Sequence, residues 1–314
     1  MKIRICLLAF LLMFVMAFLA QTQTYNQHWK KVEKMVKKDL PQSVVEEAEI
    51  IFEKAKEERN VPEMMKAYLA IMRYHGHVSG DYWQEDISKL KQWAEDETSP
   101  VYKASLYSIL GMELMNTMDA KEAIQYLRRS LEPAEALLEV PANEMQPLAI
   151  DGKTSKTYLK NNLYELLARR AIKAWVDGYW KACRVGNQNM IFPDEMNTLD
   201  GLMNTPFPPV SEYDVVADII AVYQTLLKYY QQEGNREALL LTALEAYDTM
   251  KFLHGGKKEN FELQLRSLMT EFADVEACAE VYISLMAYTD MGDAERLAMI
   301  RKGMVSYPDR KSVV

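Results

Sequence analysis

The chain has 314 residues, 49% of them hydrophobic, and its 45 acidic and 37 basic side chains give a net charge of −8. This hydrophobic content excludes disorder for most of the chain. An acidic chain without a lysine or arginine cluster is a poor ligand for nucleic acids, so we exclude nucleic acid as a partner. The length allows a large core or one continuous stack of helical layers.

Residues 1–20 predict a signal peptide, because Lys2 and Arg4 precede an apolar run that is followed directly by polar residues. The run is shorter than the roughly 20 residues of a membrane-spanning helix. We expect cleavage at its end, with Ala17 as the alternative, or a retained N-terminal anchor; lipidation at Cys6 is a further alternative. Cleavage would change the net charge to −8 − 2 = −10. We therefore expect an exported protein of the periplasm, cell envelope or surface, without a membrane span after cleavage.

Apolar residues recur with the 3.6-residue period of a helix almost throughout, which predicts an all-α chain without substantial sheet. The expected helices, in chain order, cover residues 29–36, 44–55, 62–76, 81–97, 100–114, 120–131, 134–140, 158–175, 215–230, a stretch following Gly234-Asn235, 261–272, 281–288 and 294–304. The first two are joined only by Leu40-Pro41, and so short a joint favours antiparallel packing.

Two proline-bearing segments interrupt the helical pattern. Residues 141–157 predict a long connection, and residues 184–210, with four prolines and two glycines, predict a long loop. Loops of that length are usually functional or lie between lobes. We expect an N-terminal helical lobe over residues 25–183 and a C-terminal lobe of helical hairpins over residues 211–309.

Two turn phrases indicate how the second lobe is built. "EGNREAL" (residues 233–239) and "MGDAERLA" (residues 291–298) place glycine and a capping residue before an alanine that allows close helix packing. They resemble tetratricopeptide-type hairpins, although they lie 58 residues apart, which excludes a strict 34-residue repeat. We expect an irregular α-solenoid, with a compact bundle as the alternative.

No residue pattern indicates catalysis, a cofactor or a metal, so we predict that the chain is not an enzyme. His75-Gly76-His77 is expected in a loop without a third ligand at helical spacing. Paired carboxylates such as Glu46-Glu47 sit on polar helix faces, and we interpret them as solvated charge. Methionines are interpreted as core filler, among them Met64, Met65, Met112, Met115 and Met118.

Other side chains leave alternatives open. Tyr229-Tyr230 and Trp180 could line a peptide or glycan groove, with burial in the core as the commoner role. Cys183 and Cys278 could form one disulfide or remain two small buried residues. Val281 stands where a thioester motif beginning at Cys278 would need glutamine, so that motif cannot form a thioester.

Several phrases resemble the helical N-terminal region of large bacterial alpha-2-macroglobulin-like proteins. They are "KDLPQS" (residues 38–43), "IFEKAKEERN" (51–60), "SPVYKASLYSILG" (99–111), "NNLYELLARRAI" (161–172) and "DMGDAERLAMIRKGMVSYP" (290–308). The resemblance implies an envelope-associated protein whose later β-sandwich domains and bait region trap proteases. No inhibitory residue carries over, since the chain ends at Val314 before any such domain. We expect a piece of a longer protein or a helical relative without the trap.

The leading hypothesis is therefore a noncatalytic, exported scaffold for protein contacts, including proteases or envelope proteins met through downstream domains. The rival is an independent helical receptor for peptides or glycans, with its site near the segment 184–210. A hydrolase would require convergent buried carboxylates.

Overall fold

The computed structural model describes residues 25–80, 82–116, 120–148, 161–253, 258–288 and 292–307. The described residues form helices and one isolated antiparallel bridge between Pro141 and Asn162, without a β-strand, so the all-α prediction is confirmed. The expected signal peptide lies outside these residues. None of the described helices combines the length and apolarity needed to cross a lipid bilayer.

The chain divides into two compact units. Unit 1 comprises residues 1–106 and 143–152, and unit 2 comprises residues 107–142 and 153–314. The lobes expected on either side of residues 184–210 follow a different division, which stays a prediction.

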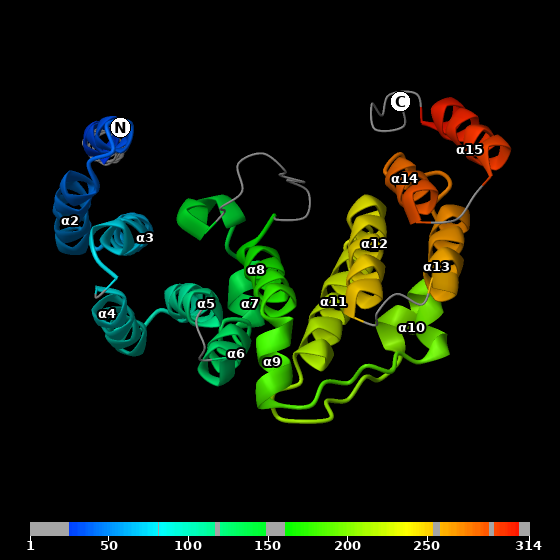
Figure 1. The fold of residues 1–314 in the computed structure, drawn as a ribbon, viewed down its shortest axis with the longest axis horizontal. Helices are drawn as coiled ribbons and strands as arrows, with labels where there is room; N and C mark the ends of the chain where they lie inside the picture. Colours follow the sequence, from blue (N-terminus) through cyan, green and yellow to red (C-terminus); the bar gives the residue numbers. More distant parts are fainter. Residues whose placement is uncertain are drawn as a thin grey trace, which may run out of the picture. The chain divides into compact units, whose positions relative to one another are not determined.

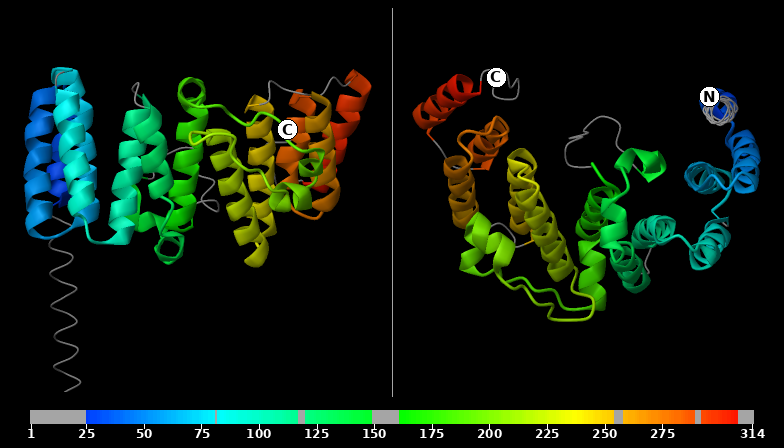
Figure 2. Two further views of the ribbon diagram at one scale, coloured as in Figure 1. Left: turned by 90° about the horizontal axis from the view of Figure 1, so that it is seen from below. Right: turned by 180° about the vertical axis from the view of Figure 1, so that it is seen from behind.

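Unit 1 begins with a helix over residues 25–36 and continues through α2 (Pro41–Glu57), α3 (Val61–Val78), α4 (Tyr82–Asp96) and the start of α5 (Pro100–Asn116). Helices α2 and α3 pack together, as do α3 and α4, and they lie alongside one another in the blue to cyan part of Figure 2. The hydroxyl of Tyr25 bonds Glu58, whereas His28 contacts Glu47. Tyr25 at the start of the first helix thus meets Glu58 directly after α2, and His28, further along, meets Glu47 in the middle of α2, which is the antiparallel order that the sequence predicts.

The same local device ends two successive helices in unit 1. Asp39 and Arg59 both have φ of 54°, the left-handed conformation that commonly terminates a helix. Pro41 is the first residue of α2, as expected, and the Asn60 side chain accepts a hydrogen bond from the Glu63 amide of α3 at 3.3 Å. A left-handed residue that ends one helix and a cap or a proline that starts the next make these very short connections possible.

Unit 2 starts within α5 and continues through short and long helices (Figure 1). They are α6 (Ala120–Arg129), α7 (Ala134–Leu138), α8 (Leu163–Asp177), α9 (Tyr179–Val185), η3 (Asp194–Asn197), α10 (Leu199–Asn204), α11 (Val215–Gln232), α12 (Arg236–Leu253), α13 (Lys258–Glu271), α14 (Cys278–Tyr288) and α15 (Asp293–Ser306). From α11 onward each helix packs on the next. Gly234, with φ of +66°, and the Asn235 cap of α12 form the predicted turn.

Three sequence expectations need correction. The segment 184–210 is not one irregular loop: α9 ends inside it, and η3 and α10 follow, because Thr198 caps α10 and Leu202 is fully buried. The expected connection 141–157 starts with the 3-10 helix η1 (Ala142–Leu148), and α8 begins at Leu163, where Asn162 caps it, rather than near residue 158. Residues 149–160 lie outside the described part.

The core of unit 2 includes polar groups as well as apolar ones. The guanidinium of Arg169 on α8 pairs with Glu245 and donates to the Thr242 hydroxyl of α12 at 2.9 Å. Thr242 is fully buried, and the equally buried Tyr223 of α11 is bonded to Thr249 of α12 at 3.0 Å. Polar contacts in the core thus join α8 to α12 and α11 to α12.

Candidate functional site

One buried carboxylate organises the segment that carries the candidate site. Asp214 is fully buried and caps α11, its Oδ1 accepting from the amides of Val216 and Ala217 at 3.1 and 3.2 Å. Its Oδ2 accepts from the amides of Asn189 and Val210, both at 3.0 Å. A single side chain therefore fixes a helix start and both arms of the 187–213 segment.

Two further contacts hold these arms and α10 against α11. The Gln188 side chain accepts from the Val215 amide at 2.9 Å and donates to the Tyr213 carbonyl at 3.0 Å. The Gln224 amide of α11 donates to the carbonyls of Leu202 and Thr205 at 3.0 and 2.8 Å. The segment has a defined conformation even though its sequence reads as a loop.

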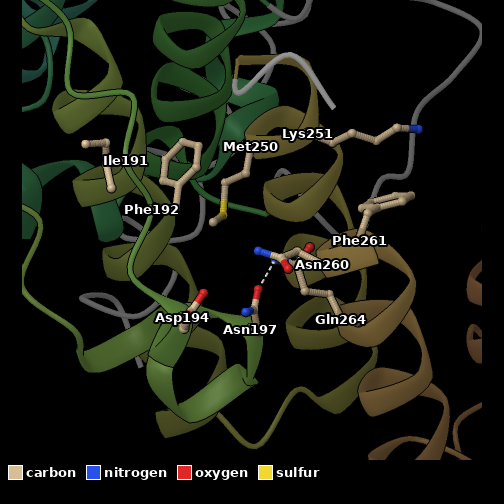
Figure 3. Close-up of a pocket in the computed structure, with 9 residues that line it drawn as sticks. All are labelled: Ile191, Phe192, Asp194, Asn197, Met250, Lys251, Asn260, Phe261 and Gln264. Carbon is tan, nitrogen blue, oxygen red and sulfur yellow. Dashed lines mark hydrogen bonds between the residues drawn. The ribbon is translucent and has the colours of Figure 1, made fainter. Parts of the chain in front are cut away.

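A pocket forms where this segment meets α12 and α13 (Figure 3). Its cavity volume is about 70 Å³. The lining residues are Ile191, Phe192, Asp194, Asn197, Met250, Lys251, Asn260, Phe261 and Gln264. Apolar side chains come from three separate stretches of the chain, and polar side chains stand among them.

The polar side of the pocket is built from amides and one carboxylate. The Gln264 side chain donates to the Asn197 side chain at 2.8 Å, drawn as a dashed line in Figure 3, and this bond ties η3 to α13. The side chains of Asp194 and Asn260 form no hydrogen bond with another described residue. Their oxygen and nitrogen atoms can therefore pair with a ligand's backbone or polar groups.

The apolar side combines aromatic rings with a cation at the edge. Phe192 stacks on Phe207 with ring centroids 5.3 Å apart, and the Nζ of Lys251 lies 4.5 Å from the ring centroid of Phe261 and 3.0 Å from that of Tyr288. Burial lowers the pKa of Lys251, although nearby Asp248 opposes this effect. Ile191 projects into solvent with 79% of its surface exposed.

The histidines and aromatic residues that the sequence analysis considered as site candidates do not come together in one site among the described residues. His75 and His77 lie in the last turn of α3 and not in a loop, because the helix continues past Gly76 to Val78. Among the described side chains, no three histidine, cysteine, aspartate or glutamate groups gather as a metal site requires. Trp180 is exposed and Tyr230 is buried. Neither lines the pocket in Figure 3.

The methionines and cysteines also have distinct positions. Met64, Met65 and Met115 are buried, whereas Met118 lies outside the described residues. Cys183 and Cys278 are free thiols, and Cys183 is exposed. The expectation of a disulfide between them and the alternative that both are buried are therefore both wrong. Burial raises the pKa of the Cys278 thiol, although a hydrogen bond with Tyr307 opposes this effect.

The buried carboxylates take part in caps and ion pairs. Glu47 was expected to be solvated, but it is buried between His28 at 2.6 Å and Lys31 at 3.1 Å. Asp86 pairs with His75. Glu165 accepts from the Asn161 amide at 2.9 Å and from its capping partner Asn162 at 3.1 Å.

Comparison of the chain with protein-family models, with curated proteins and with solved structures returned no match. The resemblance to alpha-2-macroglobulin-like proteins therefore stays a prediction.

Proposed function

We propose that this chain is a noncatalytic helical scaffold for protein contacts and that the pocket formed by residues 191–197, α12 and α13 receives an apolar side chain of a partner protein. The observation that carries the proposal is the composition of this pocket. Phe192, Met250 and Phe261 offer an apolar site, and Asn197 and Gln264 stand beside them. Protein interfaces commonly combine a central apolar anchor with a polar rim.

The size of the pocket favours a single side chain over an oligosaccharide. Its volume of about 70 Å³ falls well below the roughly 300–1,000 Å³ of typical small-molecule pockets. A partner's leucine or methionine side chain can enter it, while the exposed Ile191 adds apolar contact area beside it. The side chains of Asp194 and Asn260, which have no hydrogen-bond partner among the described residues, can then bind the partner's backbone.

The proposed architecture is an irregular α-solenoid of tetratricopeptide-like hairpins. Its support is the sequential packing of α11 to α15 and the glycine turn before α12. We further propose that the chain corresponds to the exported, N-terminal helical part of an alpha-2-macroglobulin-like protease-trapping protein. This rests on the sequence phrases given above, and an antibody to residues 25–314 tests it through the size of the native polypeptide.

A second candidate function is an independent receptor for peptides or glycans. The observation in its favour is that four pocket residues, Ile191 to Asn197, belong to the segment in which such a site was expected. Amide and aromatic groups together are also suited to sugars. A rise in melting temperature with oligosaccharides, lost when Phe192 is replaced by alanine, would favour this function.

The test of the leading function is selection of a random peptide library on the full chain. We expect enriched peptides with one dominant apolar residue, and we expect their binding to weaken at least tenfold in the variant Ile191→Asp. The matched control is Val305→Asp, because Val305 is 82% exposed but lies on α15, outside the pocket. Equal weakening of peptide binding in the Ile191→Asp and Val305→Asp variants, or a selection that enriches no peptide, would count against the proposal.

A further inference from the structure

Unit 1 contains a larger cavity, of about 530 Å³, that none of the functions considered above uses. Its lining comes from α2, α3 and α4: Glu49, Phe52 and Glu53 stand on α2, and His75 and Trp93 stand on α3 and α4. The cavity is open to solvent along residues of α2 and α4 that are exposed. Its volume lies in the range of sites that hold a drug-sized ligand or a short chain segment.

The floor of this groove holds an oriented histidine. The Nδ1 of His75 lies 2.9 and 3.1 Å from the two carboxylate oxygens of Asp86, which is only 2% exposed. An ionised carboxylate only accepts hydrogen bonds, so Nδ1 carries the proton. The imidazole also stacks on Tyr82 at 4.4 Å, and its Nε2 has no hydrogen-bond partner among the described residues. The contact with Asp86 therefore fixes the orientation of the imidazole, and a ligand in the groove can bond its Nε2.

Three aromatic side chains also line the groove. Phe52, Tyr68 and Trp93 contact one another with ring centroids 5.6 to 6.0 Å apart. The hydroxyl of Tyr68 is already committed to the Asp86 carbonyl at 2.7 Å. The parts of the Phe52 and Trp93 rings that stay accessible can therefore receive a cation, as aromatic rings do.

The charges around the groove are predominantly negative. Glu49, Glu53 and Asp86 line it together with Lys56 and Lys89. Lys89 pairs with Glu85 at 2.8 Å and Lys56 with Glu53 at 3.9 Å, so four carboxylates stand against two ammonium groups, and Glu49 forms no ion pair with another described residue. Acceptors, aromatic faces and excess negative charge together match a ligand that carries positive charge and hydrogen-bond donors.

We propose that this groove binds an arginine- or lysine-bearing peptide segment of a partner protein. The basic side chain would lie against Trp93 and pair with Glu49, and with Glu53 in place of Lys56. A donor of the same segment would bond the Nε2 of His75. This deepens the proposed function, since it gives the scaffold a second contact site with a preference opposite in charge to its own surface.

Fluorescence anisotropy with the full chain tests the proposal. The probes are a labelled, blocked hexapeptide with two arginines and the same peptide with glutamate at both positions, at low ionic strength. We expect the arginine peptide to bind more tightly and the double variant Glu49→Gln/Glu53→Gln to weaken it about fivefold to tenfold. The control is Glu57→Gln, since Glu57 is exposed on α2 and does not line the groove.

Equal affinity for both peptides, no binding, or equal weakening in the Glu57→Gln control would overturn the proposal. Binding of a neutral oligosaccharide that the double variant retains would also overturn it. Binding of the apolar peptides to the Ile191→Asp variant is measured in parallel. If this variant loses apolar-peptide binding and no form of the chain binds the arginine peptide, the groove proposal is refuted and the proposed function stands. If the arginine peptide binds through Glu49 and Glu53 but Ile191→Asp leaves apolar-peptide binding unchanged, only the pocket proposal is refuted.

Discussion

Removal of the Asp214 carboxylate is the sharpest test of how the pocket-bearing segment is held. Its two oxygens serve different parts of the structure: Oδ1 accepts from the first-turn amides of α11, and Oδ2 accepts from the amides of Asn189 and Val210. Asp214→Ala removes all four bonds. Asp214→Asn keeps an acceptor at only one of the two oxygen positions.

The magnitudes follow from these contacts. Loss of the cap costs about 1 kcal/mol, with a range of about 0.5–2 kcal/mol. The partly buried Asn189 amide would lose its acceptor at a cost of about 1–2 kcal/mol. Val210 is 55% exposed, so water can replace much of its bond. We expect Asp214→Ala to lower the free energy of unfolding by about 3 kcal/mol and Asp214→Asn by about half as much.

Guanidinium unfolding and amide hydrogen exchange measure these effects. Exchange should accelerate in residues 187–191 and 207–211, the two arms that Asp214 holds. The control is Asp293→Asn, an exposed first-turn carboxylate of α15, for which we expect a change below about 0.5 kcal/mol. A loss below about 0.5 kcal/mol for Asp214→Ala, or unchanged exchange in both arms, would refute the reasoning.

Three further predictions concern local packing and pH. Gly201→Ala should disrupt α10 and the adjacent pocket, because its Cβ would lie 1.7 Å from the Glu195 carbonyl oxygen; a melting curve indistinguishable from wild type would contradict this. Gly76→Ala should instead stabilise α3 by up to about 1 kcal/mol, since its Cβ meets nothing within 4 Å; the free energy of unfolding checks this. Burial raises the pKa of Glu47, but hydrogen bonds from His28 and Lys31 outweigh it and hold that pKa below its usual range. The contribution of ionised Glu47 to the free energy of unfolding is therefore present above about pH 4.5 and is lost as the pH falls below that value. In urea titrations at a series of pH values, the Glu47→Gln variant should lose less stability on acidification than the wild type.

Local sequence signals predicted much of the helical framework. Asn60-Val61-Pro62 starts α3 as a cap and proline should, and Gly234-Asn235 makes the expected turn. The helix expected over residues 81–97 is observed as Tyr82–Asp96. Helix starts, turns and helix lengths of this kind depend on residues that are close in sequence, so the local sequence is enough to predict them.

The candidate site could not be found in this way. Gln264 and Asn197 bond across 67 residues, and Gln224 holds α10 through the Leu202 carbonyl from 22 residues away. Such contacts leave no periodic pattern in the sequence. The one local signal was Thr198, three residues before Gly201, which is a cap within a segment otherwise dominated by prolines.

Glu47 and His75 show the same limit in unit 1. Glu47 occupies a polar position beside Glu46, and only the packing of the first helix against α2 buries it next to His28. His75 is oriented by Asp86, which lies on the next helix. The identity of such partners is set by tertiary packing and not by helical spacing.

The most direct test of the central claim is a photocrosslink from the pocket. A photoreactive phenylalanine analogue in place of Ile191, with the same analogue in place of Val305 as control, would be expressed in the cells that make the protein, and the adducts would be mapped by mass spectrometry. The account predicts protein adducts at position 191 that centre on apolar residues and are absent at position 305. Adducts of equal yield at both positions, or no protein adduct at position 191, would contradict it.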